Sequence, residues 1–247
     1  MDRLNIYRAV EDIMRVSNCI LGSAVLLLCF LFVPAIYAQD HSSTPSTQFL
    51  DLGFGASLPA SSTGMHGEIP GAIDGRQVTD QPTDSGRLRL GYNYFFNSIV
   101  GLDASVAASR YDHNYFGDID SASVESKLRE FTGDFVFRIP DHVSWLHPYL
   151  LAGAGVMDFA PTGNMNNATG ADSQIRSSLN YGGGVDFDIS KRIGIRAEYR
   201  GASFKTPDFN VPELITNAQT HISTPSVGIY FKLSGYKTED HTKVEGR

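Results

Sequence analysis

Two residues near the C-terminus have the types and spacing of a hydrolytic pair. His221 and Ser223 are separated by one residue, so in a β-strand their side chains share a face. A histidine beside a serine can deprotonate the hydroxyl for attack on an acyl group. A further group, commonly a carboxylate, must orient the histidine, and spacing alone places neither Glu198 nor Glu213 there. The pair indicates esterase chemistry as one alternative and two polar residues at a strand rim as the simpler interpretation.

Charged side chains also recur at every second position within several apolar segments. If these segments are strands of a narrow barrel, the charges face the lumen, where they must be paired because unpaired burial is costly. The simpler interpretation is a salt-bridged filling that fixes strand register, and the alternative is a narrow ion path. The predicted lumen charge network comprises Asp51, Arg87, Arg89, Asp103, Glu130, Asp134, Arg138, Asp186, Asp188, Arg196, Glu198, Arg200 and Lys232.

Composition excludes several other kinds of chemistry. Cys19 and Cys29 both precede the predicted mature chain, which leaves no thiol for disulfides, catalysis or metal binding. Histidines lack metal-ligand spacing, and an acidic stretch with Asp118 and Asp120 is interpreted as a solvated loop rather than a cation site. We predict no cofactor and no metal. The net charge of −7 argues against nucleic acid as a partner.

The elements that carry these residues are segments in which apolar and polar residues alternate. Around residues 86–96, Leu88 and Leu90 oppose Arg87 and Arg89. Eight such segments, joined alternately by long and short connections, predict an all-β fold: an eight-stranded antiparallel up-and-down transmembrane β-barrel. The expected strands lie near 48–57, 86–96, 100–109, 130–139, 147–159, 179–189 and 193–200, with a last one ending at 233; the expected long loops are 58–85, 112–124, 160–177 and 205–218.

The same alternation predicts which way the side chains point. In the fifth segment it places Tyr149, Leu151 and Met157 on the outer face. A soluble β-sandwich or lipocalin-like barrel, with its apolar face inward, is the competing architecture. Aromatic residues are expected to form girdles at the two membrane interfaces. The periplasmic girdle would contain Phe49, Phe95, Phe96, Phe137, Trp145, Tyr149, Phe187 and Phe231, and the outer one Tyr111, Phe159 and Phe204.

The N-terminus has the features of a secretory signal peptide. An apolar run over 20–33 is short for a membrane helix, and small Ala38 marks a cleavage point. Met14 is an alternative start, and a retained anchor is the alternative to cleavage. The predicted organisation is a signal peptide at 1–38, a short leader at 39–47, an outer-membrane barrel at 48–233 and a polar periplasmic tail at 234–247.

Three stretches resemble the OmpA-type and opacity-type family of small eight-stranded outer-membrane barrels. They are GLDASVAASRY at 101–111, HPYLLAGAGV at 147–156 and YGGGVDFDISKRIGIRAEYR at 181–200. The resemblance covers 48–233. It implies a bacterial outer-membrane location, with long loops extracellular and both barrel termini periplasmic. Many OmpA-type proteins continue into a peptidoglycan-binding domain, but here none is expected after residue 233. Family barrels commonly end on an aromatic residue that helps the insertion machinery; here that residue would be Phe231, an internal position.

The resemblance implies a non-enzymatic barrel that displays four extracellular loops for surface binding, adhesion or envelope organisation. Expected partners are outer-membrane lipids and lipopolysaccharide, the barrel-insertion machinery and an unknown extracellular ligand. One alternative is a narrow ion-conducting pore. The other is a lipid A-modifying esterase, because outer-membrane lipid A deacylases resemble this chain in having a His-x-Ser pair like His221 and Ser223.

Overall fold

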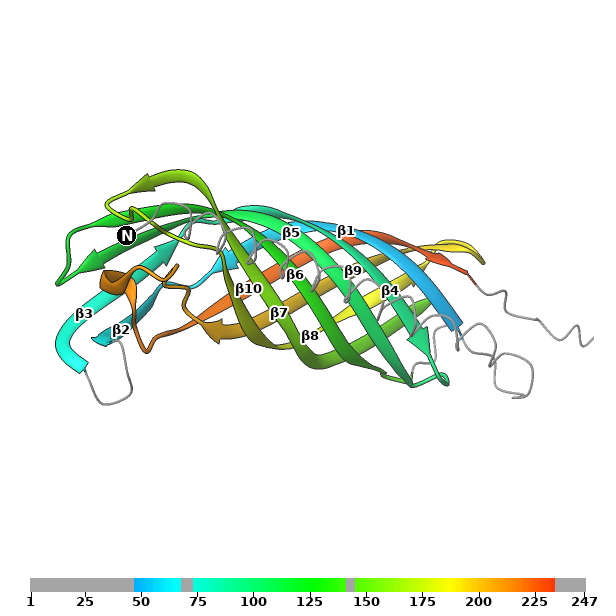
Figure 1. Cartoon of the computed structure of the whole chain (residues 1–247). Coiled ribbons are helices and arrows are strands. Elements are labelled where there is room, and N and C mark those ends of the chain that lie inside the picture. Colours follow the sequence, from blue (N-terminus) through cyan, green and yellow to red (C-terminus); the bar gives the residue numbers. More distant parts are fainter. Residues whose placement is uncertain (1–46, 68–72, 141–144, 234–247) are drawn as a thin grey trace, which may run out of the picture. The chain divides into compact units, whose positions relative to one another are not determined.

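A computed structural model describes residues 47–67, 73–140 and 145–233. The predicted signal peptide, most of the predicted leader and the predicted tail lie outside these ranges. Within them, ten strands form one antiparallel sheet, and pairing of β5 with β6 closes it into a ring. Eight strands make the barrel wall, which confirms the predicted fold class; β2 and β3 form a hairpin added beside β5 (Figure 1). The strands are β1 (Thr47–Pro59), β2 (Ser62–Gly67), β3 (Ile73–Pro82), β4 (Ser85–Phe95), β5 (Val100–Gly117), β6 (Ala122–Arg138), β7 (Leu146–Asn166), β8 (Gln174–Asp188), β9 (Ile193–Lys205) and β10 (Gln219–Lys232).

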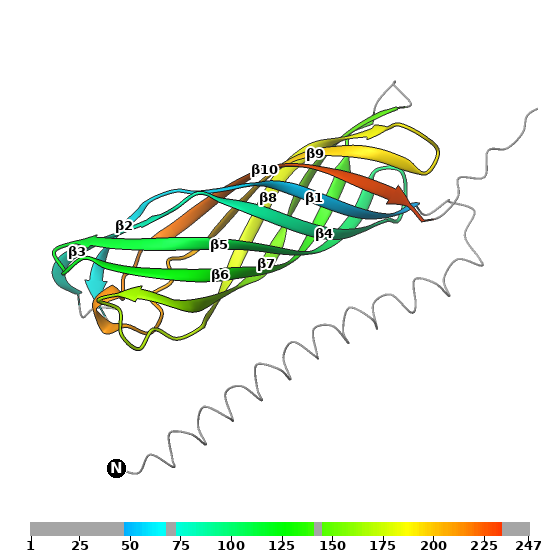
Figure 2. The same ribbon diagram turned by 90° about the horizontal axis from the view of Figure 1, so that it is seen from above.

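The two ends of the barrel differ. We call the end where β1 begins and β10 finishes the terminal end; the opposite end, with the β2–β3 hairpin, is the cap end (Figures 1 and 2). Two of the turns at the terminal end are tight. Asn97 Oδ1 accepts backbone N–H bonds of 2.8 Å from Ile99 and Val100, and Ser190 Oγ accepts one of 3.0 Å from Ile193. These Asx- and Ser-type turns explain how adjacent strands reverse within a few residues.

Alternation within the strands divides apolar from charged side chains. On β1, Leu52 and Phe54 are 52% and 68% exposed on the outside, whereas Asp51 beside Leu52 is buried inside. Leu90 and Arg89 divide in the same way on β4. The apolar face therefore points outward, which excludes the soluble architecture with reversed faces and is the arrangement that a lipid environment requires.

Three of the predicted long loops are largely strand. β5 and β6 continue through the second predicted loop and leave only 118–121 between them, β7 extends to Asn166, and the first loop contains β2 and β3. Here the alternation is inverted, because Tyr111, Tyr115 and Val124 are buried inside while polar residues point out. A strand prediction that relies on apolar residues on the outer face therefore ends these strands several residues too early.

The predicted face of the fifth segment is wrong. In β7, Tyr149, Leu151 and Met157 point into the barrel at 1–3% exposure, whereas Leu150 and Val156 are exposed outside. Both faces of this strand are apolar, so alternation could not decide its phase. The predicted girdles are also wrong at the following residues, whose rings are buried inside: Phe49, Phe95, Tyr149, Tyr111, Phe159 and Phe204.

Candidate functional site

The structure places the predicted charged residues inside the barrel and joins them in ion pairs. At the centre, Arg200 contacts three carboxylates: Glu198 (Nε to Oε1, 2.6 Å), Asp103 (Nη2 to Oδ1, 2.8 Å) and Asp134. Arg89 also bonds Asp103, at 2.6 Å, so one carboxylate bridges two guanidinium groups. Charge-assisted, shared bonds of this kind offset the cost of burying each group.

Two forked pairs flank this centre. Arg196 holds Asp186 with bonds of 2.7 and 3.0 Å, and Arg87 holds Glu130 with bonds of 2.9 and 2.7 Å. Bidentate geometry fixes both partners, and with them the register of the strands that carry them. Other members of the predicted network pair as Arg89 with Asp51, Arg138 with Asp186 and Lys232 with Asp188.

Aromatic rings fill the lumen between this network and the terminal end. Phe49 meets Phe95 and Tyr230 edge-on, with ring centroids 5.7 and 5.3 Å apart. The Arg138 guanidinium lies 4.0 Å from the Phe95 ring centre. An added Cβ at Gly194 would meet the Tyr230 ring at 2.2 Å, so only glycine leaves room for this packing.

Toward the cap end the lumen is filled by an apolar plug instead. Phe159, Leu128 and Val124 are fully buried there, and the Phe209 ring enters from the loop between β9 and β10. Phe209 has φ of 51°, which is uncommon for a bulky residue and is held here by complete burial of its ring. The plug comprises Val78, Tyr111, Tyr115, Ala122, Val124, Leu128, Met157, Phe159, Ala168, Phe204, Phe209, Val211, Leu214 and Ile222.

Two tyrosines connect the plug to its surroundings. The Tyr115 hydroxyl donates to the carbonyl oxygen of Pro207 at 2.8 Å, and the Tyr111 hydroxyl is bonded to Ser57 Oγ. Burial, reinforced by the nearby Glu130 carboxylate, raises the pKa of Tyr111 to about 12. Burial raises the pKa of Tyr115 well above its ordinary value as well. Both phenols are therefore held neutral in the folded protein.

The connections above the plug are folded against each other. The side-chain Oε1 of Gln174 accepts the Asp208 N–H at 2.9 Å, and Arg176 pairs with Asp208 at 2.7 Å. On the other side, buried Asp80 of β3 contacts His113 Nδ1 at 3.0 Å and so fastens the hairpin to β5. These contacts make the cap a continuation of the barrel rather than a set of free loops.

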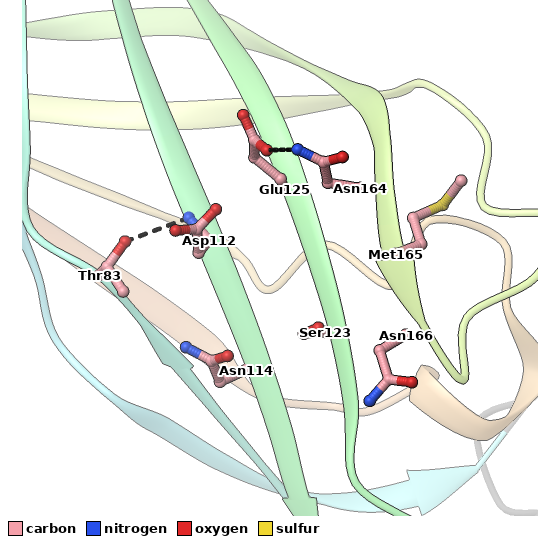
Figure 3. A pocket seen from close by; sticks show the side chains of 8 residues that line it. All are labelled: Thr83, Asp112, Asn114, Ser123, Glu125, Asn164, Met165 and Asn166. Carbon is pink, nitrogen blue, oxygen red and sulfur yellow. Dashed lines mark hydrogen bonds between the residues drawn. The ribbon is translucent and has the colours of Figure 1, made fainter.

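A polar hollow lies on the outside of this cap. It occupies about 490 Å³ over β5, β6 and β7 (Figure 3). Thr83 Oγ1 accepts the Asp112 N–H at 3.1 Å, and the Asn164 amide bonds the Glu125 carboxylate. We call it the cap hollow. Its lining residues are Thr83, Asp112, Asn114, Ser123, Glu125, Asn164, Met165 and Asn166.

The structure also brings His221 and Ser223 together on the outer wall. Ser223 Oγ lies 3.4 Å from His221 Nε2, as the sequence spacing suggests. On the other ring nitrogen, Nδ1, the partner is the hydroxyl of Ser203 at 3.2 Å. Glu198 is turned into the lumen and held by Arg200. The pair thus has a serine where a catalytic triad would have a carboxylate.

Sequence spacing missed the other members of this group. The Tyr181 ring stacks on His221 with centroids 5.7 Å apart, and the Tyr199 hydroxyl lies 2.8 Å from Ser223 Oγ. They come from β8 and β9, and only strand register brings them next to β10. We call Tyr181, Tyr199, Ser203, His221 and Ser223 the wall cluster.

Other site types find no support among the described residues. In that part of the chain, no group of three or more His, Cys, Asp and Glu side chains is arranged to hold a metal ion. No helix in the same ranges is long and apolar enough to cross a membrane.

A closed antiparallel barrel with an apolar outer face and paired charges inside defines a membrane-spanning β-barrel protein. The comparisons specify the family. Residues 24–241 match the family described as Outer membrane protein beta-barrel domain, so the chain belongs to it and is a bacterial outer-membrane barrel. No curated protein matches the chain.

A solved structure agrees on the fold. OprG from Pseudomonas aeruginosa is similar with a TM-score of 0.55 at 17% identity, over 78% of this chain and 98% of that one. Neisserial surface protein A has a TM-score of 0.49 at 15% identity, over 76% of this chain and 99% of that one. At these identities the likeness concerns the fold alone.

Proposed function

We propose that the protein is a non-enzymatic surface-recognition scaffold, with the cap end outside the cell, both barrel termini in the periplasm and the cap hollow as its recognition surface. The observation that carries the proposal is the rigid cap: strands continue past the apolar belt and pack around a core of their own. On β5, outward residues are apolar through Ala108 and polar from Arg110 to Asn114, and only Phe116 at the tip of the strand is again apolar on this face. Binding surfaces held by a rigid scaffold need little ordering on binding.

The chemistry of the cap hollow favours an uncharged, hydroxyl-rich ligand such as a neutral glycan. Asn114 and Asn166 present amides that both donate and accept hydrogen bonds, and Asp112 and Glu125 present acceptors. Met165, 38% exposed, adds an apolar contact. The Asp112 carboxylate disfavours anionic ligands, whereas the charge of Glu125 is shared with Arg110 at 3.2 Å.

The test is binding of nanodisc-embedded protein to an array of immobilised neutral and acidic oligosaccharides. Asp112→Arg should remove binding to neutral glycans by placing a long cation in the hollow. Glu213→Arg is the matched control, because Glu213 is exposed at the cap in the 3₁₀ turn Pro212–Leu214 and outside the hollow. Equal losses in both variants, or no glycan bound by the native protein, would refute the assignment.

The plug bears on the pore alternative. Fully buried Leu128, Phe159 and Phe209 leave an apolar section that an ion would have to cross without water. We infer that the native barrel does not conduct. Discrete current steps from purified protein in a planar bilayer would contradict this.

A further inference from the structure

The outer wall of the barrel carries a groove within its apolar belt. It occupies about 570 Å³ across β1, β10, β9 and β8. Phe54 and Val227, 68% and 60% exposed, form its apolar sides, and small outward residues form its floor. Because the chain is an outer-membrane barrel, this surface faces lipid. Its main lining residues are Phe54, Gly183, Ala197, Tyr199, Pro225 and Val227.

The groove has a local cause in the sequence. Ala197 and Gly183 place a methyl group and a hydrogen where neighbouring outward positions carry larger side chains. Pro225 has no N–H, and the β1–β10 ladder runs from Phe49 to Gly55 and resumes at Leu58, skipping the positions opposite Thr224 and Pro225. The floor of the groove is therefore set by the backbone and by small side chains, and does not depend on how mobile side chains happen to lie.

The wall cluster adjoins the cap-side end of this groove. Tyr199 belongs to both, since its ring lines the groove and its hydroxyl lies 2.8 Å from Ser223 Oγ. His221 follows, between Ser223 at 3.4 Å and Ser203 at 3.2 Å. Further along the same face of β9, exposed Lys205 supplies a positive charge.

This order of groups matches the order within a single lipid. Apolar sides would contact an acyl chain, the hydroxyls and imidazole would meet ester and sugar oxygens, and the lysine would meet a phosphate. We propose that the groove, the wall cluster and Lys205 form a binding site for one phosphorylated, acylated glycolipid of the lipid A type. Its assignment to the outer leaflet rests on the orientation given under Proposed function; the binding chemistry does not.

Binding fits the geometry better than hydrolysis does. His221 Nδ1 meets the Ser203 hydroxyl, which carries no negative charge to stabilise an imidazolium. The backbone around Ser223 is paired with β9 from Gln219 to Phe231, so its N–H groups are not arranged around a developing oxyanion. The hydroxyls and imidazole are left as hydrogen-bonding groups for a ligand.

Native mass spectrometry of the detergent-solubilised barrel, supplied with purified lipid A or with phosphatidylcholine, tests the groove. Ala197→Phe should fill it and weaken retention of both lipids roughly tenfold, because the new ring occupies the space that an acyl chain would fill. Ala104→Phe is the matched control, because it makes the same change on the outward face of β5, outside the groove. Equal losses in both variants, or no lipid retained by the native chain, would overturn the site.

The double variant His221→Ala/Ser223→Ala tests the polar end. It should reduce the preference for lipid A over phosphatidylcholine several-fold, because the hydrogen bonds that it removes serve the sugar and ester oxygens of lipid A. Tyr94→Phe, which removes a hydroxyl from the outward face of β4 outside the groove, should leave the preference unchanged. Heat-dependent gel migration verifies that each variant is folded. An unchanged preference in the double variant, or recovery of lipid A lacking an acyl chain, would overturn the binding assignment.

Discussion

The two halves of one lumen are filled by opposite chemistry. Between the aromatic rings and the plug, Arg89, Arg196 and Arg200 hold carboxylates from several strands. Toward the cap end, the plug contains fully buried Leu128 and Phe159. The charged half depends on specific partners and hence on strand register, whereas the apolar half depends mainly on filled volume. The lumen of a narrow barrel can thus be filled in two ways, and substitutions in the two halves should have different effects on stability.

The largest effect should come from the charged half. Arg200→Ala leaves Asp103, Asp134 and Glu198 without a shared guanidinium, and should lower the free energy of unfolding by about 3–5 kcal/mol. Urea unfolding of barrels inserted into vesicles measures the change. Arg110→Ala is the control, since its side chain is 62% exposed in its pair with Glu125 and should contribute at most about 1 kcal/mol. Similar losses in both would show that the lumen network is not the stabilising element.

A smaller and more local effect is expected in the plug. Leu128→Ala should cost about 2–4 kcal/mol through a cavity, and should loosen the cap before the barrel wall. The measurement is the rate of protease cleavage at the cap turns, compared with urea unfolding of the whole barrel. Leu150→Ala, on the exposed outer face of β7, should leave cap cleavage unchanged. Cleavage that rises equally in both variants would remove the distinction between the two halves.

The smallest effect should be a dependence on alkaline pH in the plug. Because folding raises the pKa of Tyr111 to about 12, its contribution to stability is complete below the ordinary tyrosine pKa of about 10 and is lost as the pH rises through about 12. Protease cleavage of the cap should accelerate over that interval. Tyr111→Phe should flatten this pH dependence, and an identical pH profile in the variant would assign it to another group.

The sequence predicted the membrane-spanning wall well because one face carries nearly all the apolar residues there. On β4, alternation allows only one assignment of faces, with Leu88 and Leu90 outward and Arg87 and Arg89 inward, and the structure shows this assignment. The same rule fails for β7, where Tyr149 and Leu150 are both apolar. It fails again in the cap, where the apolar face turns inward and the pattern predicts loops in place of extended strands.

For the candidate sites, the sequence predicted only which residues of a single strand share a face. The spacing of His221 and Ser223 placed them on a shared face, but Tyr181 and Ser203 reach them through the register of β8 and β9. Likewise, alternation indicated that Arg87 and Glu130 face inward, whereas their pairing across 43 positions follows from barrel closure. Register between strands is set by the closed shape as a whole, and a single sequence gives no measure of it.

The short turn between β5 and β6 has a practical consequence. Only 118–121 separate two long paired strands, and Asp118 and Asp120 there are exposed. A foreign peptide inserted at this turn would stand at the tip of a four-stranded extension, because β3 pairs with β5 up to Gly117 and β7 pairs with β6 at Ser123. The insertion would lie beside the cap hollow, which Ser123 lines, and away from the lipid site. With the cap outside the cell, the barrel would serve as a scaffold for displaying epitopes or enzymes on living bacteria, with their distance from the membrane set by the length of the extended strands.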